Sequence, residues 1–170
     1  MTEPDIRALT LDDLPAYKAL RDGMLEAHPD AFTSDAASER AKPALAFADR
    51  IGTTDGGGFS LGAWCGGELV GAISIEREQR LKVRHIGHVI GMMVRDDQAR
   101  LGIGRLLLAG AIARCRELAG LEMLTLTVTH GNRAAQALYE QAGFECYGCL
   151  RRAIKLGDRY LDKDHMALVL

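Results

Sequence analysis

The hydrophobic positions of this chain repeat with two periods, one typical of helices and one typical of strands. Apolar residues spaced three and four apart predict helices over residues 11–28, 105–118 and 133–141. Residues 33–51 carry sparser apolar positions and predict a further helix. Asn132 lies where it can cap the last helix. The chain is therefore expected to contain four helices.

Runs that are apolar, or that alternate apolar with polar residues, predict strands between these helices. The predicted strands cover residues 6–9, 59–64, 69–76, 83–94, 124–129, 144–150 and 160–170. The glycine pair at 66–67 is typical of a hairpin turn, and the glycine run at 56–58 is interpreted as a flexible link or turn. Gly87 and Gly91 interrupt one strand, which indicates a bulge or the close approach of another group.

The order of these elements predicts the fold class. Strands joined by short turns pair antiparallel, whereas the two strand–helix–strand passages imply local parallel or crossover pairing. We therefore expect an α/β (α+β) fold with a mixed, largely antiparallel central sheet of about seven strands and helices on both faces. With 170 residues and no linker or repeat, the chain is expected to be a single domain over residues 1–170.

Composition and charge exclude several classes of function. The hydrophobic share of 48% is enough for one sizeable core. The 21 basic and 23 acidic residues leave a net charge of −2, so neither nucleic acid nor an anionic membrane is expected as a partner. No apolar run approaches the ~20 residues of a membrane helix, and the acidic residues 1–5 do not resemble a secretory signal. The sequence thus predicts a cytoplasmic protein.

The four cysteines are interpreted as reduced thiols. Cys65 and Cys115 are isolated, whereas Cys146 and Cys149 form a C-x-x-C pair. A structural zinc site needs two further ligands at similar spacing, and the sequence has no second pair. A redox pair usually begins a helix, but this pair falls in a predicted strand. The spacing is therefore interpreted as incidental, and no metal is expected.

One candidate binding motif lies where a strand runs into a helix. Gly102 and Gly104 open the helix, between Arg100 and Arg105. The first amide groups of a helix lack partners and carry partial positive charge, and glycine lets an anion approach them. A dinucleotide fingerprint would need a third glycine where Leu107 stands, and a Walker loop would need Gly-Lys-Ser/Thr. The turn therefore predicts a pyrophosphate site of another kind.

Two blocks of the sequence resemble the GNAT N-acetyltransferase superfamily. Residues 91–108, which contain the glycine turn, resemble its acetyl-CoA-binding motif. Residues 124–144, which contain Asn132 and Tyr139, resemble its second block. The order and separation of the blocks match as well, and the resemblance covers nearly the whole chain. It implies a GNAT-like acyl-CoA N-acyltransferase fold, acetyl-CoA as co-substrate and transfer of the acetyl group to a primary amine.

The resemblance also implies which residues bind the cofactor. The pantetheine arm pairs with the main chain of the strand before the turn, here Met92, Met93 and Val94. The phosphates lie against the turn, which consists of Ala99, Arg100, Leu101, Gly102, Ile103, Gly104 and Arg105. Asn132 contacts the arm, and the same residue can serve as a helix cap.

The chain departs from the family pattern at Ala99. Family members usually carry Gln or Arg at this position, three residues before the first glycine. Gln98 or Arg100 is expected to supply the missing side chain. Because main-chain amides do most of the phosphate binding, we expect weaker rather than absent binding.

Tyr139 is the expected catalytic acid, and it also counts among the cofactor-binding residues. By resemblance it lies near the thioester sulfur and protonates the leaving thiolate. A phenol with a pKa of ~10 can donate a proton to a thiolate with a pKa of ~8.5. The other interpretation is a core aromatic residue with its hydroxyl at the edge.

His88 is the expected general base, because histidine titrates near neutrality. In a regular strand it shares a face with Ile90, Met92 and Val94. Three residues compete for the same role, namely His85, Glu76 and Glu78. Each of these candidates can instead be a solvated strand residue.

Two functions of different classes follow from these observations. The first is an N-acetyltransferase that acts by direct attack of a small-molecule or peptide amine on acetyl-CoA. The alternative is a non-catalytic acyl-CoA-binding sensor or partner module, which would keep the glycine turn and Asn132. Tyr139 favours the enzyme, whereas Ala99 favours the module. The sequence leaves open the acceptor and the choice between a monomer and a homodimer.

Overall fold

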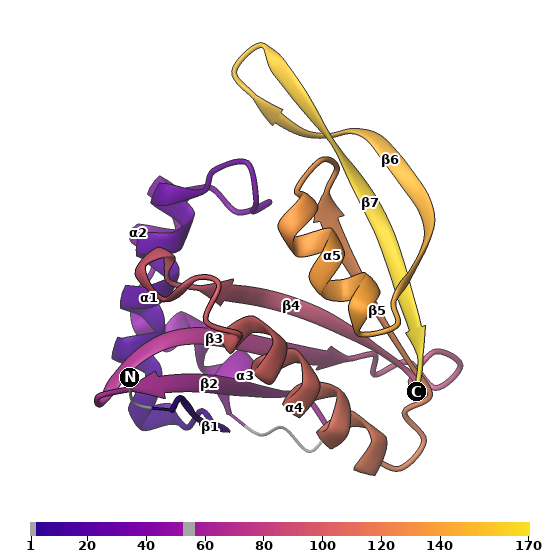
Figure 1. Cartoon of the computed structure of the whole chain (residues 1–170), viewed down its shortest axis with the longest axis horizontal. Coiled ribbons are helices and arrows are strands. Elements are labelled where there is room, and N and C mark those ends of the chain that lie inside the picture. Colours follow the sequence, from indigo (N-terminus) through magenta and orange to yellow (C-terminus); the bar gives the residue numbers. More distant parts are fainter. Residues whose placement is uncertain (1–2, 53–56) are drawn as a thin grey trace.

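One central sheet organises the computed structural model, which describes residues 3–52 and 57–170. Within these residues, seven strands pair in the order β1-β2-β3-β4-β5-β7-β6, with helices on both faces (Figure 1). The pairing of β4 with β5 is parallel, and the other neighbouring pairs are antiparallel. The predicted fold class, a mixed and largely antiparallel sheet, is confirmed.

The strands lie close to their predicted positions. They are β1 (Asp5–Ala8), β2 (Phe59–Cys65), β3 (Glu68–Arg77), β4 (Ile86–Val94), β5 (Met123–Thr129), β6 (Glu145–Leu156) and β7 (Arg159–Val169). Gly66 and Gly67 form the turn between β2 and β3, and both have the positive φ that glycine tolerates. Of the glycine run at 56–58, residue 56 lies outside the described residues.

Three of the four predicted helices are confirmed. They are α1 (Leu14–Ala27), α4 (Ile103–Glu117) and α5 (Arg133–Gln141), and the single turns η1 (Leu11–Asp13) and η3 (Asp96–Gln98) precede the first two. Asp13 fixes the entry into α1, because its carboxylate accepts hydrogen bonds from the Thr10 amide (2.8 Å) and from the Arg7 guanidinium (2.9 and 3.0 Å). No helix in the described part of the chain is long and apolar enough to span a bilayer.

The predicted helix over residues 33–51 is wrong. The segment contains three short pieces instead, α2 (Ala36–Arg40), η2 (Ala44–Phe47) and α3 (Ala48–Ile51). Pro43 has no amide hydrogen and disfavours helical backbone in the residue before it, so a continuous helix ends there. Phe47 and Ile51 are buried, but Leu45 is 73% exposed. The apolar residues of this segment therefore do not form one face.

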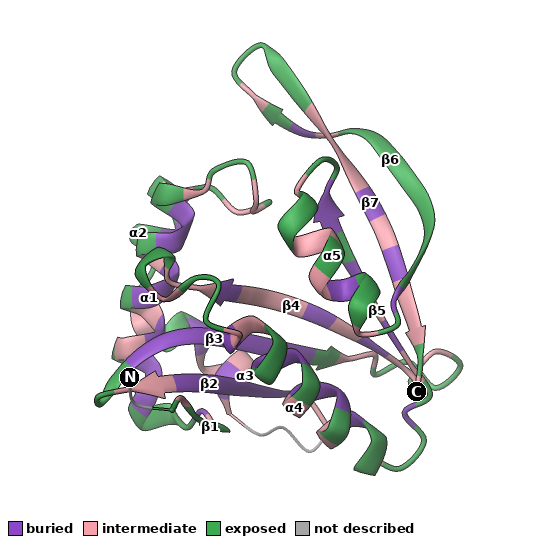
Figure 2. Ribbon diagram, in the orientation of Figure 1, coloured by how far each residue is buried: buried purple, intermediate pink, exposed green. Residues whose placement is uncertain are grey.

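The sheet separates two hydrophobic cores. The larger core contains Leu107 of α4, Leu124 of β5 and Tyr139 of α5, so α4 and α5 cover the same face. The smaller core contains Tyr17 of α1 and Ile51 of α3 on the opposite face. The central strands between them are largely buried (Figure 2). These faces are called the α4 face and the α1 face below.

β4 and β5 diverge within the sheet. Their parallel pairing is confined to Ile86–His88 and Met123–Thr125. Beyond that point β5 continues along β7 and β4 continues along β3, so the two strands separate (Figure 1). Over residues 89–94, the edge of β4 that faces β5 has no strand partner among the described residues. The fold thus leaves a stretch of main chain open in the middle of the sheet.

A bulge interrupts β4 at the start of this open stretch. Gly91 and Met92 together oppose the single residue Ile73 of β3. Gly91 has a φ of 58°, in the left-handed region that favours glycine. A β-carbon there would lie 3.3 Å from the Tyr17 hydroxyl, so a larger residue would also crowd α1. The predicted bulge in this strand is confirmed.

The bulge inverts the alternation of side chains along β4. Val89 packs into the core of the α4 face, whereas Met93 packs into the core of the α1 face. In a regular strand, residues four apart share a face. The prediction that His88 shares a face with Met92 and Val94 is therefore wrong, because the extra residue moves both to the α4 face. His88 still shares a face with Ile90, because both residues lie before the bulge.

β6 and β7 form a long hairpin at one edge of the sheet (Figure 1). Most of β6 is exposed along its length, whereas β7 is partly buried between β6 and β5 (Figure 2). Cys146 and Cys149 lie in β6, as the sequence predicts, and both are exposed free thiols. β6 therefore presents most of its side chains to solvent, whereas β7 contributes Met166 to the larger core.

Candidate active site

A cavity of 930 Å³ opens where β4 and β5 diverge. Parts of α1, β4, the glycine turn and α5 form its walls. Every residue predicted to bind the cofactor lines it, namely Met92, Met93, Val94, Ala99, Arg100, Leu101, Gly102, Ile103, Gly104, Arg105, Asn132 and Tyr139. The fold thus brings the two sequence blocks, residues 91–108 and 124–144, around one space. Their binding of a cofactor stays a prediction.

The glycine turn leaves amide groups free at the start of α4. The Leu106 amide donates to the Gly102 carbonyl over 3.0 Å, which closes the first turn of the helix. The amides of Ile103, Gly104 and Arg105 precede this bond and have no acceptor within the helix. Gly102 has a φ of 82°, a conformation that favours glycine. An anion at the turn could therefore bind to three amides and to the positive end of the helix dipole.

Gly104 permits close packing at the start of α4. A β-carbon at this position would lie 3.3 Å from Met92 Cε and 3.5 Å from Leu138 Cδ2. The start of α4 therefore sits tightly against both β4 and α5. A β-carbon at position 104 would require the end of the Met92 side chain to shift.

Ala99 has a potential substitute on each side. Gln98 and Arg100 both line the cavity, so either side chain can reach it. Arg100 and Arg105 have no carboxylate partner among the described residues. They therefore add uncompensated positive charge beside the free amides, which favours a phosphate group.

Asn132 caps α5 and lines the cavity. Its Oδ1 accepts a hydrogen bond from the Ala135 amide over 3.3 Å. Its side-chain NH₂ group has no acceptor among the described residues. Capping uses the side-chain oxygen of Asn132 and leaves its NH₂ group available as a donor. The capping role and the predicted contact with a cofactor arm are therefore geometrically compatible.

Tyr139 is buried between α5 and the sheet. Its ring meets the Phe144 ring edge-on, with centroids 5.9 Å apart. Burial raises the pKa of Tyr139 to about 12. The phenol is therefore a weaker acid than the sequence argument assumed, and full proton transfer to a thiolate is less favourable. It stays protonated near neutral pH and keeps its ability to donate a hydrogen bond.

His88 lies outside the cavity at the last paired position between β4 and β5. Its Nδ1 is 2.6 Å from Thr125 Oγ1, and its Nε2 is 3.2 Å from Glu78 Oε1. This hydrogen bond to His88 lowers the pKa of Glu78. His85 precedes β4 at the closed end of the strand pair. Neither histidine therefore meets the cofactor side of the site.

A second cavity, of 640 Å³, lies on the α1 face. Ile90 of β4, Glu76 of β3 and Arg50 of α3 form part of its wall. Ile90 lines this cavity and Met92 lines the first, so the bulge at Gly91 separates the two. Of the four residues proposed as general base, Glu76 is the one that lines either cavity.

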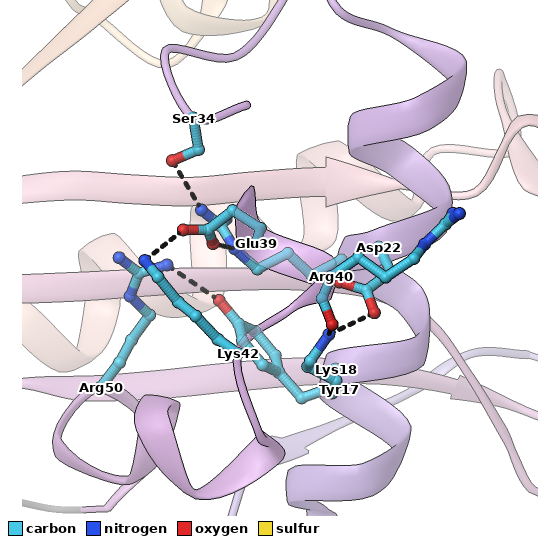
Figure 3. Close-up of polar contacts among 9 residues, drawn as sticks. Tyr17, Lys18, Asp22, Ser34, Glu39, Arg40, Lys42 and Arg50 are labelled. Atoms are coloured by element: carbon cyan, nitrogen blue, oxygen red, sulfur yellow. Dashed lines mark hydrogen bonds and ion pairs between the residues drawn. The ribbon is translucent and has the colours of Figure 1, made fainter. Parts of the chain in front are cut away.

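Arg50 carries a charge that its surroundings leave unpaired. Its Nη1 donates to the Tyr17 hydroxyl over 3.3 Å (Figure 3). The guanidinium lies 5.9 Å from the centroid of the Phe47 ring. No carboxylate pairs with it in residues 3–52 and 57–170. Sequence reasoning missed Arg50, because nothing in its local pattern separates it from any surface arginine.

Two neighbouring cations in this cavity, Arg21 and Lys42, pair with Glu39, whereas Arg77 donates to the main-chain carbonyls of Arg84 and Ala119. The Glu39 carboxylate accepts from Arg21 Nε over 2.8 Å and from Lys42 Nζ over 2.6 Å, and Lys42 and Glu39 face each other in Figure 3. Arg21 also donates to Ser34 over 3.1 Å. Arg21 and Glu39 are both buried, so their pairing removes the cost of two lone charges. This network holds the wall of the cavity and does not include Arg50.

A family model and curated relatives match this chain. The model described as the acetyltransferase (GNAT) family matches residues 18–144. An L-methionine sulfoximine/L-methionine sulfone acetyltransferase from Pseudomonas aeruginosa is 36% identical over 77 residues, which cover 45% of this chain and 44% of that protein. Across four curated acetyltransferases, the matched segments span 29% to 63% of the relative's length.

Solved structures share the fold over nearly the whole chain. A GNAT-family acetyltransferase from Streptococcus pneumoniae has a TM-score of 0.85 and 26% identity, over 99% of this chain and 100% of that one. A Salmonella typhimurium protein, described as an acetyltransferase and solved with its cofactor acetyl-CoA, has a TM-score of 0.84 and 20% identity. That match covers 99% of this chain and 95% of the other, and it concerns the fold alone.

Proposed function

This chain belongs to the GNAT acetyltransferase family, and on that premise we propose that it transfers the acetyl group of acetyl-CoA to a primary amine. The observation that carries the proposal is the 930 Å³ cavity, which joins an open strand edge to the free amides of the glycine turn. A pantetheine arm would extend along the main chain of residues 92–94, as an added strand does. The pyrophosphate would lie at the start of α4.

The proposed reaction is a direct attack in a ternary complex. The neutral amine adds to the thioester carbonyl, the carbon–sulfur bond then breaks, and the thiolate leaves. A main-chain amide of residues 92–94 would donate to the oxyanion of the intermediate. The Tyr139 hydroxyl would donate a hydrogen bond to the leaving sulfur. Glu76 would take the proton from the amine, because it lines the cavity on the acceptor side of the bulge.

The proposed acceptor is a small amino acid or a close analogue. The second cavity pairs a cation without a carboxylate partner, Arg50, with the acids Asp49 and Glu76 on its wall. A ligand that carries both a carboxylate and an ammonium group would satisfy these opposite charges. The name of the Pseudomonas aeruginosa relative, which acts on L-methionine derivatives, supports this class.

A panel of acceptors tests this proposal. Purified protein would be incubated with acetyl-CoA and free amino acids, their methyl esters or short peptides. Acetylated product would be measured by mass spectrometry, because exposed Cys146 and Cys149 would react with thiol reagents. We expect free amino acids to be the best acceptors. A preference for peptides would overturn the acceptor class, and tight acetyl-CoA binding without turnover would support the non-catalytic module.

Replacement of Tyr139 tests its role in the reaction. We expect Tyr139→Phe to lower kcat about 100-fold, because the leaving sulfur loses its donor. Affinity for acetyl-CoA, measured by calorimetry, should change far less. Tyr160→Phe is the matched control, since Tyr160 lies in β7 outside both cavities. An unchanged rate in Tyr139→Phe would remove this residue from the chemistry.

A further inference from the structure

Three side chains that can bind a metal meet near the start of α5, outside both cavities. His130 Nδ1, Cys149 Sγ and a carboxylate oxygen of Asp164 all lie within 4.8 Å of one another. His130 follows β5, Cys149 belongs to β6, and Asp164 belongs to β7. Strand pairing therefore brings together a cluster that the spacing of these residues in the sequence does not predict.

The sheet fixes the main chain of all three residues. Cys149 and Asp164 are direct partners in the antiparallel pairing of β6 with β7, so their side chains share a face. The His130 amide donates to the Asp162 carbonyl over 2.9 Å, which ties the turn after β5 to β7. The three donor atoms are thus held together before any ligand arrives.

Asp164 is the buried centre of the cluster. Its Oδ2 lies 3.0 Å from His130 Nδ1 and accepts a hydrogen bond from Gln136 Nε2 over 2.6 Å. Asp164 is buried, whereas His130 and Cys149 are exposed, so an ion can reach the cluster from solvent.

We propose that His130, Cys149 and Asp164 form a zinc site, with solvent at the fourth position. An imidazole nitrogen, a thiolate sulfur and a carboxylate oxygen are all zinc ligands. Bond lengths of about 2.0 to 2.3 Å place the ligand atoms of tetrahedral zinc about 3.5 Å apart. Small rotations of the two exposed side chains reach that spacing. Zinc would displace the thiol proton to solvent, and Gln136 would orient the Asp164 carboxylate.

Cys146 stands apart from this site despite the C-x-x-C spacing. A bulge at Tyr147 lets Cys146 face the same side as Cys149, where it pairs with Met166 rather than with Asp164. Its thiol donates to the Gly148 carbonyl over 3.5 Å, and it is not within the cluster. The motif therefore contributes one ligand, and its other cysteine is a matched control.

A cobalt titration tests the site directly. Untagged protein would be stripped of metal with a chelator and titrated with Co²⁺, whose bond to a thiolate gives a charge-transfer band. We expect one ion per chain, loss of the band in Cys149→Ser, and roughly 100-fold weaker binding in His130→Ala. Cys146→Ser should keep both the band and the affinity. Zinc should displace cobalt and raise the melting temperature of the wild type and Cys146→Ser.

Three outcomes would overturn the proposal. They are the absence of stoichiometric binding, a band that survives in Cys149→Ser, and a band lost equally in both cysteine variants. Melting temperatures of the metal-free variants show whether each one folds, and Gln136→Ala provides a further variant, expected to weaken binding about tenfold. None of these measurements uses acetyl-CoA, so the zinc site and the proposed acetyl transfer fail independently.

Discussion

The two cavities beside β4 are built by different means. The cavity between β4 and β5 offers main-chain groups, namely an open strand edge and the amides at Gly102 and Gly104. The cavity on the α1 face offers charged side chains, chiefly Arg50 and Glu76. Main-chain recognition constrains the backbone and therefore leaves glycines at fixed spacing. Side-chain recognition leaves no such pattern, so one half of the site has a motif and the other does not.

This difference has a consequence for specificity. A strand edge and a helix start can recognise an amide arm and a pyrophosphate, which do not change when the acceptor changes. Arg50 and Glu76 can be replaced without disturbing the backbone that holds the first cavity. We therefore expect changes on the α1 face to alter the acceptor or the rate, and changes at the glycine turn to alter cofactor affinity.

The largest expected effect comes from Glu76→Gln. The amide cannot take a proton from the amine, so kcat should fall about 100-fold or more, while acetyl-CoA affinity should stay unchanged. Glu78→Gln is the control, because Glu78 hydrogen-bonds His88 and lines neither cavity. Equal losses in the two variants, measured as initial rates, would contradict the assignment of the base to the α1 face.

Arg50→Ala should have the next largest effect. Loss of a charge-assisted hydrogen bond costs about 1.5 to 3 kcal/mol, so KM for a free amino acid should rise roughly 10- to 100-fold. The corresponding methyl ester lacks the carboxylate, and its KM should barely change. If the ester suffers as much as the free acid, Arg50 supports the wall of the cavity rather than the acceptor.

Gly102→Ala tests whether the main-chain amides of the glycine turn bind the cofactor. At a φ of 82°, a β-carbon costs about 1 kcal/mol or more and shifts the amides that follow. Acetyl-CoA should bind roughly tenfold more weakly by calorimetry, and KM for the acceptor should not change. Gly110→Ala in the same helix is the control, because its β-carbon would make ordinary contact at 3.4 Å. Equal weakening in both variants would argue against an anion at the turn.

Asp13→Asn should have the smallest effect, on stability alone. Its hydrogen bond with Arg7 lowers the pKa of Asp13 from 3.8 to about 2, so the unfolded state binds the proton more readily. The resulting stabilisation is present above pH ~4 and is lost as pH falls toward 2. The variant should lose about 1 to 2 kcal/mol at pH 7, measured by denaturant unfolding, and the difference should vanish near pH 2. Asp12→Asn, at an exposed neighbour, should change little.

The sequence predicted those parts of the molecule that depend on local pattern. The helices over residues 105–118 and 133–141 follow from periodicity, and the strands follow from alternating or continuous apolar runs. The glycine turn was identifiable because its backbone geometry restricts residue type. The helix predicted over residues 33–51 failed where Pro43 and an exposed Leu45 outweighed weak spacing.

Features set by strand register were not predictable. Gly91 signalled a bulge, but no local pattern shows that the bulge moves Met92 to the face opposite His88. The juxtaposition of His130, Cys149 and Asp164 depends on the pairing of β5, β7 and β6. Arg50 reaches its cavity only through the short helices that replace the predicted long one. Long-range pairing decides these positions, and single residues do not encode it.

The bulge at Gly91 lies between Ile90, which lines the second cavity, and Met92, which lines the first. Under the proposed assignment, acetyl-CoA binds in the cavity between β4 and β5, and the acceptor binds in the second cavity. The two substrates therefore bind at the same time, and no covalent relay through the protein is needed to transfer the acetyl group. Steady-state kinetics should therefore give intersecting rather than parallel double-reciprocal lines. Free CoA should leave without first passing through the acceptor cavity.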